Sequence, residues 1–103
     1  MKPVIIVSTF PDKTSITKIA NQLVKKKLVA CVNIMKISSV YSWKGKIENQ
    51  PEYLGLFKTT KKNQPVLKKE LRKLHPYDIP EIAEINVDSI NQPYLKWLVD
   101  STR

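Results

Sequence analysis

The chain has 103 residues, of which 42% are hydrophobic and 26% are charged, and its net charge is +9. This composition excludes a disordered or fibrous chain, so we expect one globular domain over residues 1–103. A single cysteine excludes an intrachain disulfide, and no stretch approaches the ~20 apolar residues of a membrane-spanning helix. A lone thiol suits a reducing compartment and the start of the chain does not resemble a signal peptide, so we expect a cytoplasmic protein.

The first two predicted elements are a strand and an amphipathic helix. Residues 4–7 form a β-branched run without alternation, which indicates a strand buried on both faces. Pro11 ends this strand, and Asp12 or Thr14 can cap the following helix. The apolar positions of that helix recur at i, i+3, i+4, i+7 and i+8: Ile16, Ile19, Ala20, Leu23 and Val24.

Two long antiparallel strands come next. Residues 28–43 and 46–60 are rich in strand-forming side chains, and Gly45 sits between them, where a hairpin turn needs positive φ. Pro51 cannot donate a ladder hydrogen bond, so it marks a bulge or an edge.

The last predicted elements are a helix, a strand and a helix. Residues 64–75 form the first of these helices, with Pro65 in its first turn, and Pro76 and Pro80 stop it. Residues 82–87 alternate and predict a strand with one core face, made of Ala83, Ile85 and Val87. Asn91 caps the last helix, whose apolar stripe is Tyr94, Leu95, Leu98 and Val99.

The order β-α-β-β-α-β-α predicts an α+β fold. The first six elements follow the ferredoxin-like βαββαβ plan, an antiparallel sheet with helices on one face, and the seventh is an extra C-terminal helix. The second strand carries Cys31, Met35 and Ile37 on the face that these helices leave bare, and the last helix is too short to cover it. Because a large bare apolar patch is unusual in a monomer, we expect an oligomer built sheet to sheet.

His75, the only histidine, and Cys31, the only cysteine, are the first candidates for chemistry. Asp78 and Glu81 are the nearest carboxylates to His75 along the chain and would complete a loose metal site. The alternative is a histidine that caps a helix C-terminus, where the dipole favours the protonated ring. Cys31 is either a small hydrophobic core residue or a metal ligand, and one chain cannot close a zinc site without further His or Cys.

Several classes of function lack their sequence signals. No G-x-S-x-G, G-x-G-x-x-G or P-loop is present, so neither a serine hydrolase nor a nucleotide-binding enzyme is predicted. The third strand, YLGLFKTT, lacks the basic-Gly-aromatic-Gly order of the RNA-recognition module, so we do not expect nucleic acid as a partner. Binding of nucleic acid through the basic helices is the third alternative, after binding of a metal ion or of a small anionic ligand. The excess of lysine is explained most simply by a solvated surface. Four aromatic residues stand at predicted element ends, where they can line a pocket or pack at a rim: Tyr41, Trp43, Tyr77 and Tyr94.

Six segments in register make the chain similar to a known family. They are STFPD (8–12), LVACVNI (28–34), YSWKGKIE (41–48), FKTT (57–60), HPYDIPEI (75–82) and YLKWL (94–98). Together they resemble the CutA1 family of divalent-cation tolerance proteins. The resemblance implies a ferredoxin-like subunit, a homotrimer with an architecture like that of PII signalling proteins, and a non-enzymatic role in tolerance of copper and other divalent metals.

The resemblance also implies where ligands would bind. Family members have a cleft between subunits, which here points to His75 and Glu81 and to Trp43, Lys58, Tyr77, Tyr94 and Trp97. Ser8 stands where some relatives carry a second cysteine, so a copper site made of several cysteines is not expected here. Weak binding of copper or another divalent metal ion would instead involve His75, Cys31, Asp78 and Glu81. The alternative is a PII-like signalling or adaptor trimer that binds a small anionic ligand at this cleft.

Overall fold

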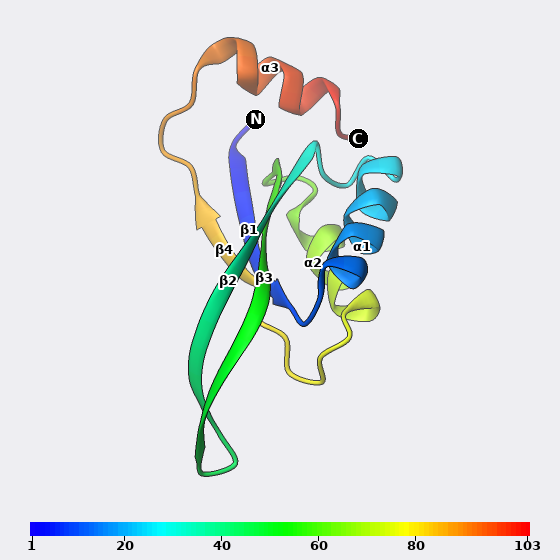
Figure 1. Ribbon diagram of the computed structural model, residues 1–103. Helices are drawn as coiled ribbons and strands as arrows, with labels where there is room; N and C mark the ends of the chain where they lie inside the picture. Colours follow the sequence, from blue (N-terminus) through cyan, green and yellow to red (C-terminus); the bar gives the residue numbers. More distant parts are fainter.

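The computed structural model describes residues 1–103 and confirms the predicted order of elements. Four strands form one antiparallel sheet in the order β2-β3-β1-β4. Helices α1 and α2 pack side by side on one face of the sheet, and α3 lies at one end, beside both chain termini (Figure 1). The bounds are β1 Pro3–Phe10, α1 Lys13–Lys25, β2 Cys31–Trp43, β3 Lys46–Thr60, α2 Gln64–Leu74, β4 Ala83–Asn86 and α3 Gln92–Asp100.

Local sequence signals explain where these elements start and stop. Asp12, not Thr14, caps α1, since its Oδ1 accepts a hydrogen bond of 2.7 Å from the backbone N–H of Ser15. The β2–β3 turn takes positive φ at Lys44 (51°) and Gly45 (78°), as the glycine predicts. Helix α2 ends one residue earlier than expected, so that His75 is the extended residue that follows it.

The core lies between the two helices and the sheet. Its buried side chains are Ile6, Phe10, Ile16, Ile19, Leu23, Leu28, Val29, Phe57, Leu67 and Leu71. Gly55 of β3 makes the close packing possible, because a Cβ there would lie 2.5 Å from Cε1 of Phe57 and 2.9 Å from Cδ1 of Ile16. Val24, predicted in the apolar stripe of α1, is instead 43% exposed.

The opposite face of the sheet is bare in the single chain, and we call it the open face. It carries apolar side chains from all four strands: Ile5, Val7, Met35, Ile37, Leu54, Leu56, Ala83 and Ile85. The expectation that β1 is buried on both faces therefore holds on the helix side only. The predicted core face of the fourth strand is also wrong, because Ile85 is 50% exposed on the open face while Ile82 packs against the core.

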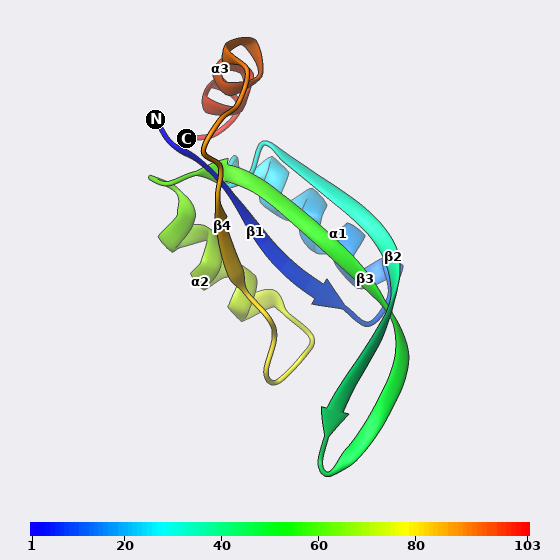
Figure 2. The ribbon, with the colours of Figure 1, turned by 90° about the vertical axis from the view of Figure 1, so that its left-hand side faces the viewer.

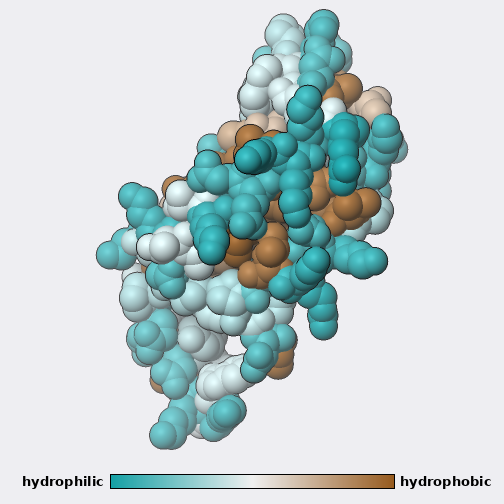
Figure 3. All heavy atoms as spheres, turned by 90° about the vertical axis from the view of Figure 1, so that its right-hand side faces the viewer, coloured by the Kyte–Doolittle hydropathy of each residue, from teal (hydrophilic) through white to brown (hydrophobic).

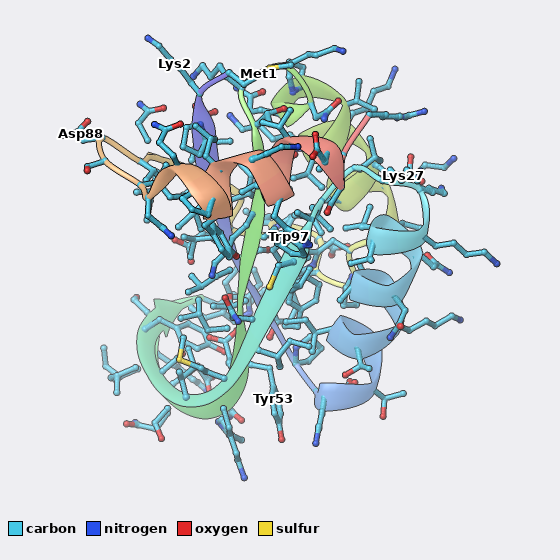
Figure 4. All side chains as sticks on the ribbon, turned by 90° about the horizontal axis from the view of Figure 1, so that it is seen from above. Met1, Lys2, Lys27, Tyr53, Asp88 and Trp97 are labelled. Atoms are coloured by element: carbon cyan, nitrogen blue, oxygen red, sulfur yellow. The ribbon has the colours of Figure 1, made fainter.

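The β2–β3 hairpin reaches well beyond the rest of the sheet (Figure 2). Past the end of β1 at Phe10, which pairs with Tyr53, the two long strands pair only with each other. At the other end of the molecule, α3 crosses above the sheet (Figure 4) and buries Leu98 completely. None of the three helices has the length and apolar character needed to cross a membrane.

Candidate functional site

His75 is held inside the molecule by contacts from β1 and from the segment that follows the histidine. Its ring stacks on Phe10 with centroids 4.3 Å apart, and only 9% of the residue is exposed. Its Nε2 lies 3.1 Å from Oγ of Ser8, and that hydroxyl donates a 2.6 Å hydrogen bond to the backbone carbonyl of Glu81. Its Nδ1 accepts a 3.1 Å hydrogen bond from the backbone N–H of Tyr77. The ring therefore ties the segment between α2 and β4 to β1.

These contacts define the protonation state of the ring. Because Nδ1 accepts from Tyr77, the proton of the neutral imidazole sits on Nε2 and is donated to Ser8. Burial lowers the pKa of His75, and it outweighs the backbone of Thr9 and the nearby carboxylate of Glu52, which favour the protonated form. The helix dipole was expected to favour protonation, but the side chain turns towards the core instead of the end of α2.

Glu52 is a functional candidate that the sequence analysis missed. It is 9% exposed although it lies beyond the end of β1, and its Oε2 accepts a 2.8 Å hydrogen bond from the hydroxyl of Tyr77. Burial and this bond raise the pKa of Tyr77 far above its ordinary value. The only signal in the sequence for a special role of Glu52 was its place beside Tyr53 in an apolar strand. The structure pairs it with the apolar Ile37.

A groove opens between the β2–β3 hairpin and the segment that joins α2 to β4. Its volume is about 930 Å³. Apolar and aromatic side chains form its walls, and the carboxylates of Glu52, Asp78 and Glu81 line it. Trp43 of the hairpin and Tyr77 of the segment after α2, both predicted for the ligand cleft, line this groove.

The other predicted cleft residues lie at the far end of the molecule. The ammonium of Lys58 sits 5.6 Å from the ring centre of Tyr94, which in turn lies 5.4 Å from the ring of Trp97, labelled in Figure 4. Lys58 and Tyr94 line a smaller cavity of about 220 Å³ under α3. Within one chain the residues predicted for the cleft thus lie in two separate places.

The predicted metal ligands are also separated. Cys31 pairs in register with Lys58 on the open face, whereas His75 contacts Ser8 and Phe10 on the helix side of the sheet. No group of three or more His, Cys, Asp and Glu residues in the chain could hold a metal ion. A single chain therefore does not fit a metal, since both ring nitrogens of His75 already have partners and the remaining donors are too few.

Comparison with known proteins identifies the architecture. Residues 4–101 match the sequence description of the CutA1 divalent ion tolerance proteins. A divalent-cation tolerance protein CutA from Pyrococcus horikoshii is 41% identical over 100 residues, covering 97% of this chain and 98% of the relative. The chain belongs to the CutA1 family.

Solved CutA1 structures share the whole fold. The crystal structure of CutA1 from Pyrococcus horikoshii superposes with a TM-score of 0.95 at 40% identity, covering 97% of this chain and 98% of that one. The divalent ion tolerance protein CutA1 from Ehrlichia chaffeensis gives 0.96 at 33% identity, covering 100% and 98%. The predicted ferredoxin-like α+β fold with an added C-terminal helix is therefore confirmed as that of CutA1.

Proposed function

We propose that this chain is a non-enzymatic divalent-cation tolerance protein that works as a homotrimer in the cytoplasm. The observation that carries the proposal is the match to CutA1 over residues 4–101 together with relatives named as tolerance proteins. A homotrimer is supported by the apolar open face, which needs a partner to leave water. The cytoplasmic location is supported by the lone free thiol of Cys31.

The absence of an enzymatic role is supported by the bonding of Ser8 and His75. A serine nucleophile needs a base that takes its proton and a third group that orients the base. Here the hydroxyl of Ser8 donates to the Glu81 carbonyl, and Nδ1 of His75 accepts from a backbone amide where a triad would have a carboxylate. The pair is a structural bridge between β1 and the segment after α2.

Metal binding in this proposal is weak and requires two subunits. The carboxylates of Asp78 and Glu81 are exposed at the groove, so they are free to meet donors of a neighbouring copy. His75 and Cys31 would join them only through an assembly or a local opening. Copper is the metal that imidazole and thiolate donors favour most, and carboxylates accept other divalent ions.

Calorimetric titration of the intact metal-free protein with Cu²⁺ and Zn²⁺ tests the proposal. We expect wild type to bind both ions and the double variant Asp78→Asn with Glu81→Gln to bind them more weakly. His75→Ala and Cys31→Ser should each weaken the binding of the metal ion that the replaced residue coordinates. Asp88→Asn with Asp100→Asn is a matched control that removes the same two charges elsewhere. Identical isotherms for every variant would contradict the assigned ligands, and no heat with wild type would contradict metal binding itself.

The PII-like alternative is not favoured, because the relatives carry the tolerance name.

A further inference from the structure

The positive charge of the chain is concentrated on one surface. We define the helical face as the outward surface of residues 13–27 and 61–74, which comprise α1, α2 and the turns beside them. These residues hold eleven of the eighteen basic side chains and only one of the nine acidic ones, Glu70. The remaining residues carry seven basic and eight acidic side chains and are close to neutral. The net charge of +9 therefore belongs to the helical face.

Most of these basic groups have no acidic partner. Lys26 pairs with Glu70 at 2.6 Å, and Lys61 and Lys68 both pair with Glu84 of β4. The other eight form no salt bridge: Lys13, Lys18, Lys25, Lys27, Lys62, Lys69, Arg72 and Lys73. All eight are exposed. Figure 3 shows this side, where long hydrophilic side chains project around a smaller apolar area.

The pattern of burial makes this surface continuous across the two helices. The buried side chains of α1 and α2 all point to the sheet, so Lys18 and Lys25 of α1 and Lys69 and Lys73 of α2 project to the other side. The surface spans about 20 Å along α1 at 1.5 Å per residue. Fixed cations spread over that length attract a polyanion, and its binding releases the small counterions that otherwise screen them.

The helical face lacks the side chains that would favour a membrane surface or a single-stranded nucleic acid. The large apolar residues exposed on the helical face are Val24 and Val66 alone, while Trp43 and Trp97 are exposed elsewhere. A membrane-surface helix uses Trp, Phe or Leu to enter the lipid, and a single-strand binder stacks bases on aromatic rings. Neither device is present here, whereas lysine is well suited to phosphate as a point charge.

We propose that the helical face binds the phosphate backbone of double-stranded nucleic acid without reading its sequence. Binding through the basic helices, the third alternative from the sequence, is thus favoured over the expectation that nucleic acid is not a partner. That expectation rested on the missing base-stacking pattern of the third strand and on a solvated lysine surface. An assembly through the open face would leave the helical face outward in every copy. Binding would then be electrostatic, with a Kd of about 1–100 μM at physiological salt and a strong dependence on salt.

Fluorescence anisotropy with the intact protein and a labelled duplex of arbitrary sequence tests this inference. If four to six phosphates are contacted, we expect log K to fall against log salt with a slope between about −3.5 and −5.5. Lys69→Gln with Lys73→Gln should reduce the magnitude of that slope by about 2. Lys36→Gln with Lys46→Gln removes the same charge from the hairpin and should leave the slope unchanged. Circular dichroism checks that each variant is folded.

Three outcomes would overturn the proposal. The first is no binding to the duplex at low salt. The second is an equal loss in both double variants, which would mean that net charge acts without a particular surface. The third is binding to vesicles of anionic phospholipid but not to duplex, which would assign the helical face to a membrane surface. Parallel titrations with duplex DNA and duplex RNA show which of the two sources of phosphate is preferred.

Discussion

At the scale of single residues, His75 shows how a position can be predicted without its role. Its place after a basic helix and before two prolines follows directly from the sequence. Its partners do not, because Ser8 lies 67 residues away and Phe10 belongs to the first strand. Only the folded sheet brings β1 under the end of α2. The buried Glu52 is equally hidden, since its partner Tyr77 comes from the same distant segment.

The buried ring should make stability depend on pH. Burial lowers the pKa of His75 in the folded state below its ordinary value of 6.5. On acidification the unfolded chain takes up this proton first, so stability is complete above pH 6.5 and falls below it until the folded pKa is passed. Within that window we expect a loss of at most about 1.4 kcal/mol per pH unit, measured by urea unfolding in the presence of a chelator.

The single histidine provides a sharp control for this prediction. His75→Gln removes the titrating group and keeps an N–H donor for Ser8, so its lower stability should be the same at about pH 7.5 and about pH 5.5. Carboxylates titrate mostly below this window. The same slope in the variant and in wild type would show that another group is responsible.

At the scale of elements, the spacing of apolar residues was sufficient to predict the order of the helices and strands and their approximate bounds. The stripe of α1 and the β-branched run of β1 are local patterns, and both appear where expected. Which face of β4 meets the core was not predictable, because Ala83 and Ile85 are more apolar than the face with Glu84. The ion pairs of Glu84 with Lys61 and Lys68 allow it to stand on the helix side.

Gly55 provides the test at this scale. A Cβ at this position would clash with Phe57 and Ile16, so Gly55→Ala should destabilise the fold by about 1–3 kcal/mol through overpacking between α1 and the sheet. Gly45→Asn is the control, because no atom lies within 4 Å of a Cβ there and asparagine tolerates positive φ. Denaturant unfolding measures both, and an unaffected Gly55→Ala variant would mean that the helix shifts freely on the sheet.

At the scale of the whole molecule, the open face and the divided cleft share one explanation. The groove beside Tyr77 and the cavity beside Tyr94 are separate in one chain. The apolar side chains between them, including Ile5 and Leu56, are those that a sheet-to-sheet contact would cover. The sequence pointed to such a contact through strands that are apolar on both faces, but no local pattern gives the relative placement of two copies.

A charged residue on the open face should break the proposed trimer. Ile85 is 50% exposed on that face, and Val66 is 48% exposed on the helical face, so they form a matched pair. We expect Ile85→Lys to sediment as a monomer because it would bury an unpaired ammonium, whereas Val66→Lys and wild type sediment as trimers. Sedimentation velocity distinguishes these states. Three identical profiles would mean that the open face is not the subunit contact.

The length of the β2–β3 hairpin beyond the rest of the sheet affects how stable its conformation is. From Ser38 to Pro51 the two strands pair only with each other, and Val40 and Ile47 are 68% and 71% exposed. A ribbon of two strands is at best marginally stable in water. In the proposed trimer, contacts with neighbouring subunits would hold this hairpin in place, whereas in a single chain the hairpin would fray from its tip.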